Sequence, residues 1–234
     1  MTRPAKNSKL KFLTNNWVGT LSATLIVVFA ALYLNELVAE RKIENQKSIA
    51  TKNILSELMT NSENFTIAVN KHSIFYDIMV FMDNYSDSES GGFIAPIDSL
   101  NKFRRKHPKL ITVKDSVQVS RSVYQYSNGE INFDFSIPQF EITTIAWKTL
   151  KSSGISQSFN FKCLMYLEGI YNITNKVSTE NEILFDEVIE YLGDEENTKE
   201  KRKKLIGRLQ LLISYEESLI KMYESSEKEL KTCC

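Results

Sequence analysis

The residues whose types could carry chemistry are few and scattered. Glu182, Asp186, Glu187 and Glu190 are spaced three or four positions apart, which places carboxylates on one side of a helix, as in half of a carboxylate metal site. The Glu-x-x-His element of such sites is absent, and the chain has only 2 histidines. We therefore interpret this cluster as a solvated helix face and expect no metal and no other cofactor.

No residue stands out as a nucleophile either. Cys163 lies beside Leu164 and Met165 in a predicted helix, where a packed thiol is favoured over a reactive one. No Ser, His and Asp can be assigned as a catalytic triad from spacing. The chain also contains no glycine-rich phosphate loop and no His-Glu-x-x-His zinc motif. We expect no catalytic residues and no enzymatic activity.

Three cysteines are too few for a disulfide framework. Two of them, Cys233 and Cys234, are the last residues of the chain. Three interpretations apply to this pair: lipidation in a eukaryote, a bridge between subunits outside the cytoplasm, or an inert tail. The inert tail is our default expectation.

Two polar residues, Asn61 and His72, interrupt an apolar heptad stripe. We expect Asn61 to fix the register of a helix and His72 to lie at the core edge with a hydrogen-bond partner. The alternative for His72 is a proton switch, because histidine titrates near neutrality. The stripe steps by four and three residues along Ile54, Leu58, Asn61, Phe65, Ala68, His72, Phe75, Met79 and Met82.

The element that must position the rest is the apolar run from Trp17 to Leu34, which holds 18 residues without a charge. About 20 apolar residues cross a bilayer, and Leu37 and Val38 extend the run. We predict a transmembrane helix over residues 15–37, continuous with a helical rod over residues 15–84. A cleaved signal peptide is disfavoured because the run continues past its best cleavage site, and a buried soluble helix because every face is apolar.

Charges around this run predict its orientation. Arg3, Lys6, Lys9 and Lys11 precede it without any acid, whereas the charges that follow are mixed. The positive-inside rule places residues 1–14 in the cytoplasm and the domain of residues 38–234 outside it. We predict a single-pass protein of a bacterial inner membrane with a periplasmic domain.

Basic and acidic residues balance at 29 each, which argues against nucleic acid as a partner.

Four residues of the anchor are candidates for contacts between helices or with lipid. Gly19 and Ala23 form a small-xxx-small pair, and Thr20 and Thr24 add hydroxyls beside it. Small residues let transmembrane helices approach closely. We therefore expect membrane lipid and further copies of this chain as partners, and a protein partner at the bundle.

After the rod, the period of the pattern changes from about 3.5 to 2. Tyr124 and Tyr126 alternate with polar residues before Asn-Gly, and Ile131 and Phe133 alternate after it, which predicts a β-hairpin near residues 123–135. A two-residue turn would pair Tyr126 with Ile131 and Tyr124 with Phe133. Residues 110–113 could add a third strand.

The remaining chain is predicted to be helical. A short helix over residues 142–152 should end on Gly154, and residues 160–192 form one or two helices. Asn-Thr-Lys-Glu at residues 197–200 has the form of a capping box for a last helix to about residue 231. That helix has its own stripe at Leu205, Leu209, Leu212, Glu216, Leu219, Tyr223, Ser226 and Leu230. The predicted fold is mainly α: a transmembrane helix continuous with a long helix, packed in a helical bundle with a small β-hairpin.

Two stretches resemble a class of uncharacterised single-pass membrane proteins of Bacteroidetes and other Gram-negative bacteria. One is the basic amino terminus, the anchor, and a charged break at residues 35–42 that leads into a long helix. The other is the segment Ile145–Gly154, followed by Leu164, Leu167 and Tyr171. This chain lacks the Asn-Asn-Trp that often follows the anchor in that class. The resemblance implies a helical, membrane-anchored architecture and no activity.

These observations lead to two hypotheses about function. The first is a membrane-anchored scaffold or sensor that acts by binding and is homo-oligomeric. The alternative is an effector whose anchor helices, with Thr20, Ser22 and Thr24 along a pore, assemble into a membrane-permeabilising channel, as in some bacterial defence systems.

Overall fold

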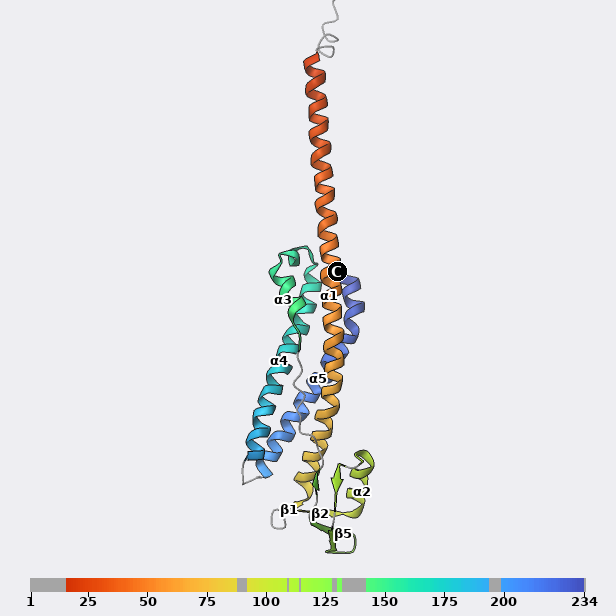
Figure 1. The fold of residues 1–234 in the computed structure, drawn as a ribbon, viewed down its shortest axis with the longest axis vertical. Coiled ribbons are helices and arrows are strands. Elements are labelled where there is room, and N and C mark those ends of the chain that lie inside the picture. Colours follow the sequence, from red (N-terminus) through yellow and green to blue (C-terminus); the bar gives the residue numbers. More distant parts are fainter. Residues whose placement is uncertain are drawn as a thin grey trace, which may run out of the picture.

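The protein is mainly α-helical in a computed structural model that describes residues 16–87, 92–108, 110–113, 115–127, 130–131, 142–193 and 199–233. Helix α1 (Asn16–Tyr85) is 70 residues long. Its upper half projects alone in Figure 1, and its lower half packs along α5 (Lys199–Cys233), which in turn packs against α4 (Phe161–Gly193). The predicted mainly α fold, with an apolar amino-terminal helix continuous with a bundle helix, is confirmed.

Helix α1 is unbroken because the sequence offers nothing to break it. Between Gly19 and Gly91 the chain contains neither glycine nor proline, the two residues that cost most inside a helix. The predicted rod over residues 15–84 is thus confirmed to within one residue at each end. The basic residues before it lie outside the described residues.

The two predicted stripes form the core of the bundle. All eight positions predicted in the last helix are buried, and so are the positions of α1 from Ile54 to Met79. Burial of Asn61 and His72 places them inside the core, not at its edge. Helix α4 is a single helix, because the polar stretch at residues 178–181 stays helical.

A short segment covers the upper end of the bundle. Helix α3 (Ile145–Ser152) is followed by a 3₁₀ turn, η1 (Ile155–Ser158), and Gly154 between them has φ +73°. Only glycine adopts that conformation readily, so the predicted glycine stop is confirmed. Asn160 then caps α4, since its side-chain oxygen accepts the backbone N–H of Lys162 at 2.9 Å.

A small antiparallel sheet lies at the far end of α1 with helix α2 (Ile97–Lys106). Its strand order is β1 (Ser86–Asp87), β2 (Gly92–Pro96), β5 (Val123–Ser127), β4 (Asp115–Gln118), and β3 (Ile111–Thr112) pairs separately with β6 (Glu130–Ile131). Phe81 of α1 holds this end together, because its ring packs at 4.7 Å from that of Phe103 and at 5.4 Å from that of Phe93.

The predicted hairpin pairing is wrong. Tyr126 pairs with Phe93 on one side and with Ser116 on the other, while Ile131 pairs with Ile111. Strand β5 therefore has both edges occupied by strands from earlier in the chain. The predicted strand near residues 110–113 exists, but its partner is β6. Phe133 and the Asn-Gly turn lie outside the described residues.

Candidate functional site

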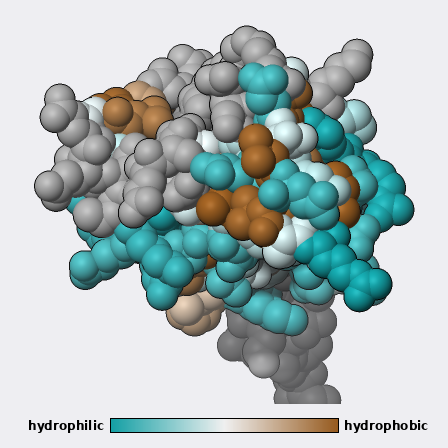
Figure 2. Space-filling view, turned by 90° about the horizontal axis from the view of Figure 1, so that it is seen from below, coloured by the Kyte–Doolittle hydropathy of each residue, from teal (hydrophilic) through white to brown (hydrophobic). Residues whose placement is uncertain are grey.

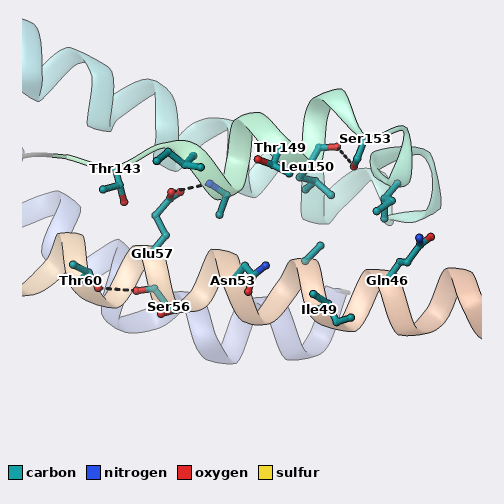
Figure 3. A pocket seen from close by; sticks show the side chains of 14 residues that line it. Gln46, Ile49, Asn53, Ser56, Glu57, Thr60, Thr143, Thr149, Leu150 and Ser153 are labelled. Atoms are coloured by element: carbon teal, nitrogen blue, oxygen red, sulfur yellow. Dashed lines mark hydrogen bonds between the residues drawn. The ribbon is translucent and has the colours of Figure 1, made fainter.

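A groove lies between α1 and α3. Its volume is about 580 Å³, within the range of roughly 300–1,000 Å³ that holds small ligands or side chains of a partner. Figure 3 shows one wall formed by α1, from Gln46 to Thr60, and the other by α3 and the residues that flank it. Its other lining residues are Ile49, Ala50, Asn53, Ser56, Glu57, Thr143, Ile145, Ala146, Thr149, Leu150, Ser153 and Ile155.

Glu57 holds the two walls together. It is buried on α1, and its carboxylate accepts the backbone N–H of Ala146 at 2.8 Å and the phenol hydroxyl of Tyr171 at 2.5 Å. Ala146 lies in the first turn of α3, where N–H groups have no partner inside the helix. Thr144, at the start of α3, makes no side-chain capping bond. A carboxylate from α1 thus caps α3 and complements its dipole.

Tyr171 extends this connection to α4. Its ring stacks on Trp147 of α3, with ring centroids 5.2 Å apart and an angle of 3° between the planes. Burial and then the hydrogen bond to the Glu57 carboxylate raise the pKa of Tyr171 well above its ordinary value, so the hydroxyl stays a donor. The groove wall formed by α3 is therefore fixed on α1 by a charge and on α4 by an aromatic stack.

Asn61 holds the backbone of Thr143, which precedes α3, against α1. Its amide nitrogen donates to the carbonyl of Thr143 at 2.9 Å, and its amide oxygen accepts the N–H of Thr143 at 3.1 Å. Beneath it, the hydroxyl of Tyr223 lies 2.7 Å from that of Thr174. The buried Asn61 side chain thus holds a backbone segment 82 residues away in the chain.

His72 has the hydrogen-bond partner that was expected. Its Nδ1 lies 3.0 and 3.1 Å from the two carboxylate oxygens of Glu216 on α5, and both side chains are buried. Burial raises the pKa of Glu216, and His72 partly offsets this shift. The pair lies outside the groove, and its position between α1 and α5 makes it a contact between the two stripes.

The other residues singled out from the sequence lie apart from the groove. Gly19, Thr20, Ala23 and Thr24 are exposed on the upper half of α1, and the hydroxyl of Thr24 donates to the carbonyl of Thr20 at 2.9 Å. The carboxylates of α4 are not all solvated: Glu187 accepts Arg208 at 2.7 Å and lies 3.1 Å from Lys204. In the described part of the chain, no three His, Cys, Asp or Glu side chains are placed to hold a metal ion.

Cys163 is buried, as predicted, but it is disulfide-bonded. The expectation of a packed free thiol is therefore wrong.

The sequence did not indicate Glu57, the only charged residue among the described residues that line the groove. One sign was available, since Glu57 stands beside the stripe residue Leu58, at a position where a charge is buried when the helix packs on both sides. Nothing in the sequence links it to Ala146, which is 89 positions away.

Helix α1 is the one helix among the described residues that is long and apolar enough to cross a membrane, and none of its apolar window is buried. Comparison of the chain with protein-family models, with curated proteins and with solved structures finds no match in any of the three.

Proposed function

We propose that the protein is a membrane-anchored sensor or scaffold that acts by binding a partner in the groove between α1 and α3. One observation carries this proposal. The α1 stretch from Gln46 to Thr60 that lines the groove belongs to the same unbroken helix as the apolar run. A partner that contacts this stretch acts on the helix that enters the membrane, with no linker between them.

The groove has the character of a binding site more than of a catalytic one. Among the described lining residues Glu57 alone is charged, and it already has two hydrogen-bond partners; the other polar lining groups are hydroxyls and amides. Aliphatic side chains such as Ile49 and Ile145 lie between them, and both are exposed. A surface with a single, already paired charge suits a partner that presents apolar side chains and a few polar groups.

Site-specific photocrosslinking tests this proposal. A benzoylphenylalanine placed at Ile145, which is 70% exposed in the groove wall, should give a discrete adduct in native membranes. The same probe at Ile189, which is 55% exposed on α4 outside the groove, is the matched control and should not give that adduct. The same adduct from both positions, or none from either, would contradict binding in the groove.

For the domain's location we propose the periplasmic side of a bacterial inner membrane, with the amino terminus in the cytoplasm. The four basic residues before the apolar run support this orientation.

We further propose that the anchors self-associate through Gly19 and Ala23. Both lie on the exposed upper half of α1, and a Cβ at Gly19 would have no neighbour within 4 Å in the described part of the chain. Gly19→Leu should reduce dimer formation in membrane crosslinking, whereas Ala30→Leu in the same anchor should not. Crosslinking that captures only monomer in the unmodified protein would contradict this proposal.

The pore-forming effector stays an alternative prediction. The structure adds no observation in its favour, since the hydroxyl of Thr24 is used within its own helix. Expression that leaves the membrane potential intact, with and without partner proteins, would contradict it.

A further inference from the structure

The disulfide of Cys163 has few choices of partner. Cys163 lies in the first turn of α4, is fully buried, and is disulfide-bonded. The chain has 3 cysteines, and the other two are Cys233 and Cys234. We infer that this bond joins the start of α4 to the carboxyl-terminal cysteine pair, and that the helical domain matures in an oxidising compartment.

The packing of α4 against α5 supports this connection. The two helices are antiparallel: Glu187 near the end of α4 binds Arg208 near the start of α5, and Tyr166 near the start of α4 donates to the carbonyl of Met222 at 3.1 Å. The start of α4 and the end of α5 therefore meet at one end of the bundle. Leu230 is buried three positions before Cys233, where α5 ends.

The bond carries information about the compartment. Two thiols form a disulfide by losing two protons and two electrons, which a protein disulfide oxidant takes up as it becomes a dithiol. Such bonds persist outside the cytoplasm and are rare within it. A domain whose buried Cys163 is oxidised therefore belongs on the side of the membrane opposite the reducing cytoplasm. This conclusion is independent of the groove and of its partner.

The bond also lies beside the groove wall. Cys163 belongs to the same core cluster as Phe159, Trp147 and Leu150, and Leu150 lines the groove. Figure 1 shows the end of α5 beside α1 at the end of the bundle where α3 lies. Reduction should therefore loosen α3 more than the distant α2.

Peptide mapping of the full-length protein tests the connection. Thiols are alkylated in intact cells, and the protein is purified and digested with trypsin without reductant. The peptide of residues 163–176 should be linked to the peptide of residues 232–234, and reduction should separate them. The unreduced protein should migrate as a monomer on a denaturing gel. Alkylated Cys163, or a bond that holds two chains together, would overturn the inference.

A stability comparison keeps the test independent of mapping. Dithiothreitol should lower the unfolding temperature of the wild type and speed amide exchange in α3 more than in α2. Cys163→Ala should show the lower temperature without reductant and no further change with it. Either Cys233→Ala or Cys234→Ala should reproduce that behaviour. An equal response of the wild type and Cys163→Ala to reductant would contradict the bond, and the wild-type measurement stands even if a variant fails to fold.

Discussion

The two halves of α1 differ in how their apolar side chains are covered by the rest of the protein. From Trp17 to Asn53 nearly every side chain described is exposed, and the large apolar ones among them include Leu25, Phe29 and Leu34. From Ile54 to Met79 the stripe residues are buried, most of them in one core with residues of α4 and α5, whereas apolar residues off the stripe such as Met59 and Ile67 are exposed. The same residue types thus form an exposed apolar surface when they cover all faces of a helix and a protein core when they lie on one.

The far end of the molecule offers a second contrast. Figure 2 looks onto this end, and on the coloured part of the surface the apolar patches are small and separated by hydrophilic residues. Individual apolar side chains such as Val117 and Val119 are exposed there. Scattered apolar residues are normal on protein surfaces, so they give no reason to place a partner at this end.

The largest expected difference between the two halves of α1 comes from a phenylalanine in each. Phe65→Ala removes a buried ring that packs 5.9 Å from that of Tyr223, and should lower the free energy of unfolding by about 3–5 kcal/mol. Phe29→Ala removes an exposed ring from the upper half and should leave the unfolding of the bundle unchanged. Denaturant titration of the full chain in detergent micelles measures both. Equal losses would erase the distinction between the halves.

Introducing an arginine should have the larger effect in the upper half of α1, in contrast to the phenylalanine substitutions. Val28→Arg, in the middle of the apolar run, should oppose membrane insertion by about 2.5–3.5 kcal/mol. Ile67→Arg, at an exposed position of the lower half, should change neither insertion nor stability by more than about 0.5 kcal/mol. The fraction of protein resistant to carbonate extraction from membranes reports insertion. If Val28→Arg stayed fully embedded while Ile67→Arg unfolded the bundle, the assignment of the halves would be reversed.

A smaller effect separates two tyrosines. Tyr171→Phe removes the hydroxyl that donates to Glu57 and should cost about 1–3 kcal/mol, because a buried carboxylate oxygen loses its partner. Tyr33→Phe in the exposed half is the matched control and should be neutral for unfolding. Thermal unfolding followed by circular dichroism compares them. A neutral Tyr171→Phe would show that Glu57 does not depend on this bond.

The smallest expected effect is a change in pH dependence. Burial raises the pKa of Glu216 above its ordinary value of 4.5, so the folded state binds this proton more tightly than the unfolded state does. The contribution of Glu216 to stability is therefore greatest below that value and is lost as pH rises through the raised pKa. Glu216→Gln should remove this loss and keep an acceptor for His72. An unchanged slope of unfolding free energy against pH would contradict the assignment.

The sequence predicts the long helices well because their signals are local and repeated. The stripe from Leu205 to Leu230 was read from spacing alone, and all its positions are buried. The two stripes together also contain one long-range signal. His72 is a polar residue in the stripe of α1, Glu216 is a polar residue in the stripe of α5, and the two side chains contact each other in the core. Matching polar positions between two stripes is thus a usable signal for pairing antiparallel helices.

The strand pairing and the groove were beyond such reasoning. Alternation identified β5, but Tyr126 lies between Phe93 of β2 and Ser116 of β4, and both of these strands precede the Asn-Gly turn that was expected to set the pairing. The groove depends on Glu57 reaching Ala146 and Asn61 reaching Thr143, contacts that span more than eighty positions. A period shows which face of an element is buried, but it does not show against what. The resemblance to bacterial single-pass membrane proteins stays a prediction.

Helix α1 runs unbroken from the apolar run to the groove. Spin labels attached through an unnatural ketone-bearing residue at Leu34 and Met59, both exposed, leave the cysteines untouched. Double electron–electron resonance in lipid nanodiscs then measures the distance between the labels. With a rise of about 1.5 Å per residue, the two backbone positions lie about 38 Å apart, and we expect a narrow distribution near that value. A broad distribution centred well below about 38 Å would mean that α1 breaks between the apolar run and the groove, and would contradict a continuous helix.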